Sequence, residues 1–334
     1  MLAAVKTSET MHLNVAEVPT PELSSGEVLL KVEYCGVCGS DLHAYKNSKG
    51  YEFVKAPRIL GHEVVGIVVE TFEKENEHLI QRRVVAEAIN FCGECENCQN
   101  NRSNICENFK VLGLHMDGGM AQFVRCKANL LQPVVEEVPS ELAALTEPVS
   151  VAVHAVEVIT HVKKGDHVWI QGAGIIGFLV GLICKHNGAK VTIAGLPQDK
   201  ENRLVHAESF EFDTYVETES APVERKVDVF FECSGSQKGV EAGIQRVKKG
   251  GKFVFVALYE KDINLPLNIL VRNEVNLLTT YSCKSDEYGR SLELIKQYKN
   301  EISKIIRIYP LNQASQAFLD ALSQKTLKPI LQLA

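Results

Sequence analysis

The most informative sequence in the second half of this 334-residue chain is Val168-Trp-Ile-Gln-Gly172-Ala-Gly174-Ile-Ile-Gly177. Its G-x-G-x-x-G pattern follows an apolar strand and opens an apolar helix, which is the context of a dinucleotide-binding turn. The first glycine permits the tight turn, the second lets backbone N–H groups approach a pyrophosphate, and the third allows the helix to pack close to the strand. The sequence therefore predicts a nucleotide site at Gly172, Gly174, Ile175, Ile176 and Gly177.

Strand and helix patterns alternate on both sides of this turn, from Pro148 onward. The expected strands are His167–Gln171, Lys190–Ala194, Val227–Cys233, Lys252–Leu258 and Val275–Thr280, and the expected helices are Val149–Ile159, Ile175–Asn187, Gln237–Lys248 and Glu287–Tyr298. Such alternation is typical of a parallel sheet with crossover helices. Before Glu147 the pattern is different, because short strands at Glu27–Tyr34, Glu63–Glu70 and Ala121–Arg125 are separated by turns. We expect a β-rich first half and an α/β second half.

The length and composition of the chain indicate a two-domain globular protein that binds a small molecule. A chain of 334 residues fits two domains. Its formal charge is −6 and it has no basic stripe, so we expect a small-molecule partner rather than nucleic acid. The N-terminus has no apolar signal segment, and the longest apolar stretch, Ile175–Cys184, is too short to span a bilayer. We therefore expect a cytoplasmic protein without a membrane partner.

Four of the ten cysteines, Cys92, Cys95, Cys98 and Cys106, lie within fifteen positions. Cysteines with gaps of two, two and seven residues can converge on one tetrahedral zinc, because each short gap forms a turn that returns sulfur to sulfur. Disulfides are the alternative, but three cysteines at successive two-residue gaps are awkward to pair. The spacing predicts a structural zinc site.

The ribose-binding position is less clear. A carboxylate normally follows the second strand of a dinucleotide-binding fold, where it binds the 2′-hydroxyl of NAD, but Gly195 stands there. Asp199 comes four residues later, beside Lys200 and Arg203. Either a displaced carboxylate binds NAD, or the basic groups bind the 2′-phosphate of NADP. The sequence leaves both open.

A second metal site is suggested by two separate stretches. Cys35-Gly-Val-Cys38-Gly-Ser40-Asp41-Leu-His43 and Gly61-His62-Glu63 together offer a thiolate, an imidazole and a carboxylate. A catalytic zinc uses three protein ligands and keeps one position open. Each stretch alone is weak evidence, since a lone histidine is often structural.

Taken in order, these motifs resemble the zinc-containing medium-chain alcohol and polyol dehydrogenases. The resemblance covers nearly the whole chain and includes Asp117-Gly-Gly119 and Glu147-Pro148, the latter similar to the sorbitol-dehydrogenase branch. It implies a GroES-like catalytic domain over 1–148 with a C-terminal return over 286–334, and a Rossmann cofactor domain over 149–285. It also implies a homodimer or homotetramer, paired through the strand expected at Val275–Thr280.

The resemblance further implies roles for individual residues. Cys38 and His62 would bind the catalytic zinc, with Glu63 or Glu147 as third ligand. Ser40 would receive the substrate proton, His43 would pass it on, and Asp41 would orient one of the histidines. The implied reaction is reversible oxidation of a secondary alcohol of a polyol or sugar alcohol to a ketone, with hydride transfer to NAD or NADP. A threonine- or simple-alcohol dehydrogenase and a non-catalytic redox sensor are the alternatives.

Overall fold

The chain packs as two compact units in the computed structural model, which describes residues 1–218 and 226–333. The first unit comprises Met1–Glu147 and Lys284–Ala334, and the second comprises Pro148–Cys283. Among the described residues no helix is long and apolar enough to cross a membrane.

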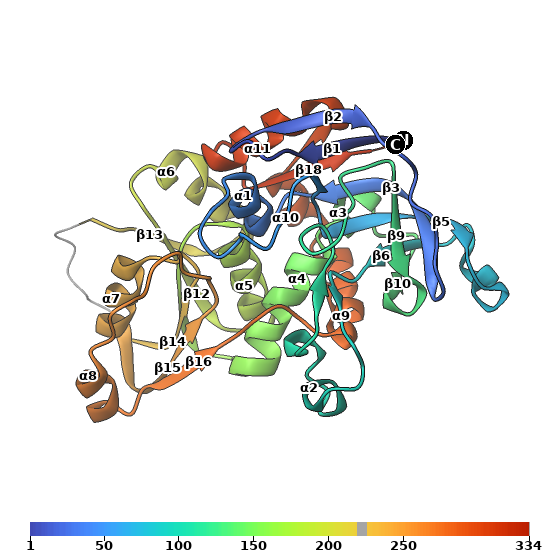
Figure 1. Ribbon diagram of the computed structural model, residues 1–334. Helices are drawn as coiled ribbons and strands as arrows, with labels where there is room; N and C mark the ends of the chain where they lie inside the picture. Colours follow the sequence, from blue (N-terminus) through green and yellow to red (C-terminus); the bar gives the residue numbers. More distant parts are fainter. Residues whose placement is uncertain (219–225, 334) are drawn as a thin grey trace. The chain divides into compact units, whose positions relative to one another are not determined.

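A parallel sheet forms the centre of the second unit (Figure 1). Over the residues described, its strand order is β13-β12-β11-β14-β15-β16. The strands are β11 (His167–Gln171), β12 (Lys190–Gly195), β13 (Asp213–Val216), β14 (Val227–Glu232), β15 (Val247–Phe255) and β16 (Asn276–Thr279). The order runs outward in both directions from β11, which creates a switch point between β11 and β14. This is the Rossmann arrangement, in which ligands bind at the carboxyl ends of the strands.

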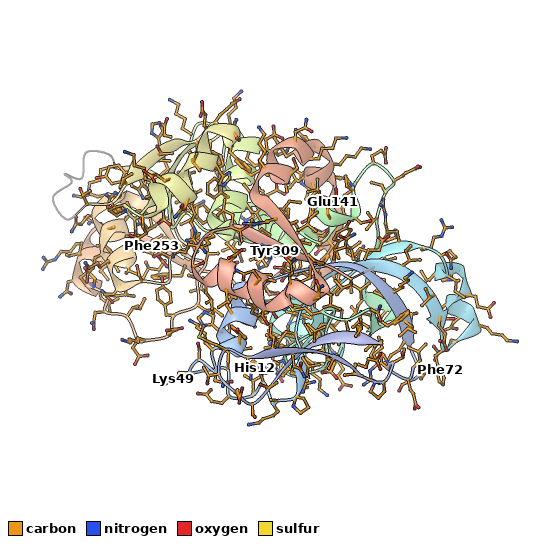
Figure 2. All side chains as sticks on the ribbon, turned by 90° about the horizontal axis from the view of Figure 1, so that it is seen from above. His12, Lys49, Phe72, Glu141, Phe253 and Tyr309 are labelled. Atoms are coloured by element: carbon orange, nitrogen blue, oxygen red, sulfur yellow. The ribbon has the colours of Figure 1, made fainter. Side chains whose placement is uncertain are left out.

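The helices of the second unit follow from apolar patterning. They are α5 (Ile175–His186), α6 (Asp199–Asn202), α7 (Gln237–Arg246) and α8 (Leu267–Arg272), with 3-10 segment η5 (Leu204–Phe210). Residues Gly177 to Cys184 of α5 are all buried. Between the sheet and α7, Phe230 and Phe253 pack with ring centroids 5.0 Å apart; Phe253 is labelled in Figure 2.

Several elements of the second unit differ from the sequence prediction, among them the short helices α6 and α8, which were not expected. Strand β15 begins at Val247, before the expected Lys252, because Val247 already pairs with Val227 and a bulge follows. The strand ends at Phe255, since the next two backbone N–H groups both donate to the carbonyl of Glu232. Strand β13 was not expected. The helix expected at Val149–Ile159 begins earlier, as α4 (Thr146–Val153), and continues as π-helix η4 (His154–Thr160).

A mixed sheet dominates the first unit. Among the described residues its order is β10-β6-β5-β3-β18-β17, with β9 also pairing with β3. These strands are β3 (Glu27–Gly36), β5 (Glu63–Thr71), β6 (Arg83–Ala86), β9 (Phe123–Lys127), β10 (Leu131–Pro133), β17 (Ile306–Pro310) and β18 (Lys328–Gln332). Smaller sheets join β1 (Leu2–Lys6), β2 (Leu13–Glu17) and β4 (Arg58–Ile59), and join β7 (Ile89–Asn90) to β8 (Lys110–Val111). The predicted strand Ala121–Arg125 lies slightly later, as β9.

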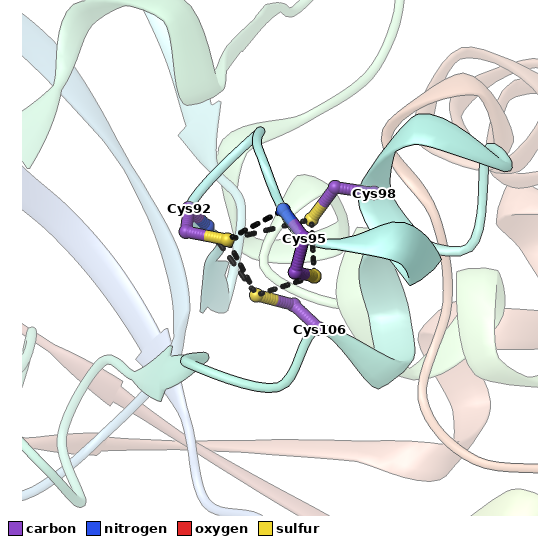
Figure 3. Close-up of side chains that lie close together, drawn as sticks. All are labelled: Cys92, Cys95, Cys98 and Cys106. Atoms are coloured by element: carbon purple, nitrogen blue, oxygen red, sulfur yellow. Dashed lines mark hydrogen bonds between the residues drawn. The ribbon is translucent and has the colours of Figure 1, made fainter.

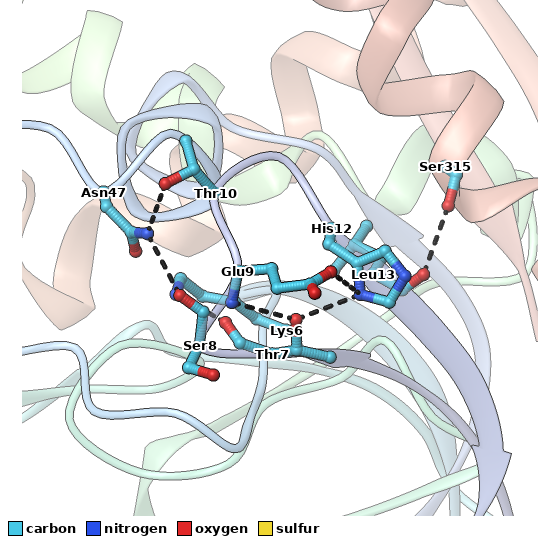
Figure 4. A network of polar contacts seen from close by, with 9 residues as sticks. All are labelled: Lys6, Thr7, Ser8, Glu9, Thr10, His12, Leu13, Asn47 and Ser315. Carbon is cyan, nitrogen blue, oxygen red and sulfur yellow. Dashed lines mark hydrogen bonds and ion pairs between the residues drawn. The ribbon is translucent and has the colours of Figure 1, made fainter.

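The C-terminal segment completes this sheet. Strand β18 pairs antiparallel with β3 and parallel with β17. Helix α11 (Ala314–Leu322) packs Phe318 against Tyr45, and Ser315 Oγ donates to the Leu13 carbonyl at 3.5 Å (Figure 4). The Tyr309 hydroxyl, labelled in Figure 2, donates to Asp320 at 2.8 Å. The unit's other helices include α3 (Ser140–Ala143), α9 (Ser285–Gln297) and α10 (Lys299–Ile302). The last strand therefore supplies residues next to β3 and its following turn.

Candidate active site and metal sites

Cys38 lies at the start of the short helix α1 (Gly39–Tyr45), directly after β3. It occupies the N-cap position, where its backbone N–H donates to Asp41 Oδ2 at 2.9 Å. This capping bond fixes the turn that carries the thiol. The sequence Cys38-Gly-Ser-Asp41 therefore positions Cys38 by local hydrogen bonding.

The Asp41 carboxylate joins this turn to the second stretch. Its Oδ1 accepts a hydrogen bond from Gly61 N at 3.1 Å and lies 3.7 Å from His62 Nδ1. Asp41 is fully buried, and burial raises the pKa of its carboxyl group. Burial lowers the pKa of His62, but the Asp41 carboxylate and the Cys38 thiol outweigh it and hold this pKa well above the usual range. One buried carboxylate thus connects Cys38, Gly61 and His62.

Cys38, His62 and Glu63 bring one ligand atom each to within 4.8 Å of one another. A sulfur, an imidazole nitrogen and a carboxylate oxygen match the donor set of a catalytic zinc. The carboxylate oxygen Glu63 Oε1 is buried and has no hydrogen-bond partner among the described residues. Buried polar atoms without partners are costly, and a bound cation would compensate the anionic ones. These three residues therefore fit a zinc ion.

Glu147, the other candidate for third ligand, lies in the first turn of α4 and is not part of this close group. It is 8% exposed. Burial raises the pKa of Glu147 to about 7, with Glu63 and Asp41 acting in the same direction and His62 and Lys328 opposing them. The charged groups of the site therefore influence the pKa of Glu147, but Glu63 is the carboxylate whose ligand atom lies close to those of Cys38 and His62.

Lys328, which sequence reasoning missed, comes from the last strand and forms an ion pair with Glu63. Its side chain is 1% exposed, and its Nζ also donates to the Val37 carbonyl at 3.0 Å. Burial lowers the pKa of Lys328, but the Glu63 and Cys38 anions outweigh it and raise the value above the usual one. The available signal was a lysine within the apolar C-terminal stretch Leu327-Lys-Pro-Ile-Leu.

Ser40 and His43 occupy successive turns of α1. Ser40 Oγ lies 3.4 Å from His62 Nε2, and His43 Nδ1 lies 3.4 Å from Ser48 Oγ. The His43 ring stacks on Tyr51, with centroids 5.1 Å apart and planes 15° apart. Tyr51 therefore fixes the plane of the His43 ring, a contact that the sequence did not indicate.

The four-cysteine lobe forms a compact cage (Figure 3). Its helix α2 (Glu96–Gln99) and 3-10 turn η2 (Ser103–Ile105) supply the turns between the thiols. Pairs of sulfurs lie 3.4, 3.5, 3.9 and 4.0 Å apart. Sulfurs around a tetrahedral zinc with Zn–S bonds of ~2.3 Å would be about 3.8 Å apart. Backbone N–H groups of Glu94 and Cys95 lower the pKa of Cys92 to about 6, which favours a thiolate. All four cysteines are free, so the disulfide alternative is wrong.

The glycine turn has the backbone that a dinucleotide site needs. Gly172 has φ +112°, and a Cβ there would lie 2.9 Å from Ser234 N. A Cβ on Gly177 would lie 2.1 Å from the Gly172 carbonyl oxygen, so only glycine fits. Gly174 is the N-cap of α5, with Ile175 and Ile176 in its first turn. The N-terminal N–H groups of α5 can therefore bind phosphate oxygens.

Family models of known proteins match segments in both halves of the chain. Residues 24–140 match the family described as alcohol dehydrogenase GroES-like domain, and residues 176–297 match zinc-binding dehydrogenase. A sorbitol dehydrogenase from Halalkalibacterium halodurans is 31% identical, over 99% of both chains. The protein belongs to the zinc-containing medium-chain alcohol/polyol dehydrogenase superfamily, in its sorbitol-dehydrogenase-like branch.

Two further relatives span most of the chain. An L-threonine 3-dehydrogenase from Thermococcus kodakarensis is 32% identical over 81% of this chain and 79% of its own. The crystal structure of a protein from Sinorhizobium meliloti 1021 bound to NADP has a TM-score of 0.87 and 26% identity, over 99% of this chain and 98% of its own. The protein is thus a zinc- and NAD(P)-dependent alcohol dehydrogenase with a GroES-like and a Rossmann domain, and its substrate is a small alcohol.

In this dehydrogenase the end of β12 differs from the usual cofactor site. Gly195 ends the strand, and Asp199 begins α6. Asp199 Oδ2 accepts a hydrogen bond from Leu196 N at 2.8 Å, and Oδ1 lies 3.6 Å from an Arg203 guanidinium nitrogen. Lys200 is exposed. The structure therefore brings Asp199 and Arg203 together and leaves Lys200 apart in solvent.

Proposed function

We propose that this dehydrogenase reversibly oxidises a secondary alcohol of a polyol or sugar alcohol to the ketone, with hydride transfer to NAD(P). The observation that carries the proposal is the close group of Cys38, His62 and Glu63 beside Ser40 on α1. Zinc held by these residues would supply Lewis-acid chemistry: it lowers the pKa of water from ~15.7 to about 7, which corresponds to on the order of 12 kcal/mol.

Ser40 and His43 form the proposed proton path. Ser40 Oγ lies within reach of the ligand His62, so it is near any hydroxyl that enters the site. Residues three apart on a helix share a face, so Ser40 and His43 are neighbours on one side of α1. We infer that Ser40 relays the proton lost by the alcohol: its hydroxyl oxygen takes up that proton while its own hydroxyl proton leaves towards His43. His43, held by Tyr51 and Ser48, takes up the relayed proton and releases one to solvent.

Asp41, Lys328 and Glu147 would support this chemistry without contacting the reacting atoms. Asp41 holds the Cys38 turn and His62 in fixed positions relative to each other, through its contacts with Cys38 N, Gly61 N and His62 Nδ1. Lys328 offsets the charge of Glu63. Glu147, whose pKa is raised to about 7 by burial, would be the second carboxylate near the metal and could exchange with Glu63 as ligand.

The polyol class is supported by the Glu147-Pro148 pair and by the sorbitol dehydrogenase relative. The threonine dehydrogenase relative supports the runner-up, an amino-alcohol or simple-alcohol substrate on the same scaffold. Initial rates would be measured with NAD and NADP against sugar alcohols, their phosphates, threonine and short alcohols. Highest kcat/KM with an unphosphorylated or phosphorylated polyol supports the proposal, whereas highest kcat/KM with threonine or a short alcohol refutes it.

A second copy of the chain is the proposed partner of the edge strand β16. Apolar side chains are exposed on this strand and on α8 before it: Leu267 at 59%, Ile269 at 49%, Val271 at 72% and Leu277 at 39%. An exposed edge strand with apolar neighbours favours pairing with another chain. We propose a homodimer or homotetramer, located in the cytoplasm. Val271→Glu should reduce the mass measured by light scattering after gel filtration; an unassociated wild-type chain would refute the assembly.

A further inference from the structure

The end of β12 raises the question of how this enzyme selects its dinucleotide. An acid that ends this strand usually binds the ribose 2′-hydroxyl of NAD and repels the 2′-phosphate of NADP. Here the strand ends at Gly195, which has no side chain for either task.

The Asp199 side chain occupies the space that a side chain at position 195 would fill. A Cβ built on Gly195 would lie 3.0 Å from Asp199 Cβ and 3.1 Å from Asp199 Oδ2. The same position is 3.2 Å from the Cβ of Ala173, which belongs to the glycine turn after β11. The carboxylate of Asp199 therefore reaches back over Gly195, beside the residues that face the cofactor phosphates.

Asp199 is held in this position by the chain itself. Leu196 N donates to its Oδ2 at 2.8 Å, and Asp199 N donates to the Leu196 carbonyl at 2.9 Å. Its other oxygen, Oδ1, is buried and has no hydrogen-bond partner among the described residues. A buried acceptor without a donor is unfavourable, and a hydroxyl donor would relieve that cost.

We propose that Asp199 replaces the missing carboxylate of β12, accepts a hydrogen bond from the adenosine ribose 2′-hydroxyl through Oδ1, and gives the enzyme a preference for NAD(H) over NADP(H). Gly195 is then required as a glycine because it makes room for this displaced carboxylate. The residue deciding cofactor preference lies four positions later than usual.

The basic residues nearby do not form a comparable phosphate site. The Arg203 side chain is 20% exposed and faces Asp199 Oδ1. Burial lowers the pKa of Arg203, and Asp199 is the neighbouring charge that raises it. A 2′-phosphate would bring about −1.5 to −2 charges against the same carboxylate. The Arg203 guanidinium, already paired with Asp199, and the solvent-exposed Lys200 would have to offset both. Charge balance therefore favours a ribose hydroxyl.

Equilibrium binding of NADH and NADPH to the full-length, zinc-loaded enzyme tests this proposal without any turnover. The readout is the ratio of the two Kd values, from titrations of nicotinamide fluorescence. We expect wild type to bind NADH at least about tenfold tighter than NADPH. Asp199→Asn keeps an oxygen for the Leu196 N–H, so the turn should survive, but NADH binding should weaken roughly ten- to hundredfold.

Two further variants make the result specific. Glu201→Gln removes an exposed charge from the same short helix and should leave the ratio of Kd values unchanged. The double variant Gly195→Asp/Asp199→Gly returns the carboxylate to the end of β12 and should restore the preference for NADH. If its thermal melt indicates a misfolded protein, Asp199→Asn alone decides.

The opposite results would overturn the assignment. Wild type that binds NADPH as tightly as NADH or more tightly, with that binding lost in Arg203→Ala, would identify a phosphate site. A ratio unchanged in Asp199→Asn would mean that Asp199 only closes the turn at Leu196.

Discussion

The four-cysteine lobe and the Cys38 site both bring metal-binding side chains together around a position suited to zinc, but they are assembled in different ways. The lobe takes all its ligands from fifteen consecutive positions, and short turns are enough to bring the sulfurs to 3.4–4.0 Å. The Cys38 site draws on separate stretches and depends on buried charges: Asp41 ties the stretches together and Lys328 offsets Glu63.

This difference in construction corresponds to a difference in chemistry. Four thiolates close the coordination shell of a zinc ion, so substrate cannot reach a metal in the lobe. Three protein ligands leave one coordination position open for substrate at the Cys38 site. Substitutions at the two sites should therefore differ in their effects on turnover, stability and metal content.

Replacing Cys38 with serine should produce the largest effect. The variant loses a soft ligand of the open site, so kcat/KM should fall by at least about 10³-fold, because zinc contributes several kcal/mol to charge stabilisation. Metal analysis should detect about one zinc per chain where wild type has two. Full turnover by a Cys38→Ser protein that lacks this zinc would contradict the proposed site.

Replacing Lys328 with methionine should mainly affect stability. Removing one partner of a buried ion pair costs about 3–5 kcal/mol, since Glu63 would keep an uncompensated charge. The loss in the free energy of unfolding, from urea titrations, should be larger in metal-free protein than in zinc-loaded protein, because zinc also neutralises Glu63.

Lys6 provides a matched control for Lys328. It is 2% exposed, but its Nζ donates to the Thr7 carbonyl, and burial alone lowers the pKa of Lys6. Lys6→Met should therefore cost less than Lys328→Met, and its effect should not depend on zinc. Equal losses in both variants, with and without metal, would mean that Lys328 has no electrostatic role at the site.

Replacing Ser40 with alanine should affect turnover at constant metal content. A positioned proton acceptor contributes about 10²–10⁴-fold, so kcat should fall by at least about 10²-fold while both zinc ions remain. Ser48→Ala is the comparison, because Ser48 Oγ lies 3.4 Å from Nδ1 of His43, the later residue of the path. Its effect should be smaller; a Ser40→Ala enzyme with wild-type kcat would exclude Ser40 from the path.

The two sites also differ in how much of them could be predicted. The spacing of cysteines and of glycines determines local turns. The four-cysteine lobe and the glycine turn at Gly172 could therefore be predicted from the sequence. The pairing of Glu63 with Lys328 depends on β18 lying beside β3, and nothing local to either residue encodes it. Asp199 was recognised as a candidate, but its position over Gly195 depends on the turn at Leu196. Similarly, β15 begins early because of its pairing with β14.

Replacing Cys95 with serine should have the smallest effect on catalysis. The variant should lose the lobe's zinc and keep the zinc at Cys38, so the metal content falls to about one per chain, as in Cys38→Ser. Because the closed lobe offers substrate no coordination position, kcat of the folded enzyme should stay within about threefold of wild type. Hydrogen exchange should increase over residues 92–106, where the metal replaces a packed core. If Cys38→Ser and Cys95→Ser each retain one zinc per chain but only Cys95→Ser is active, catalysis belongs to the open site at Cys38. If Cys95→Ser loses turnover while the zinc at Cys38 and the fold remain intact, the lobe also acts in catalysis.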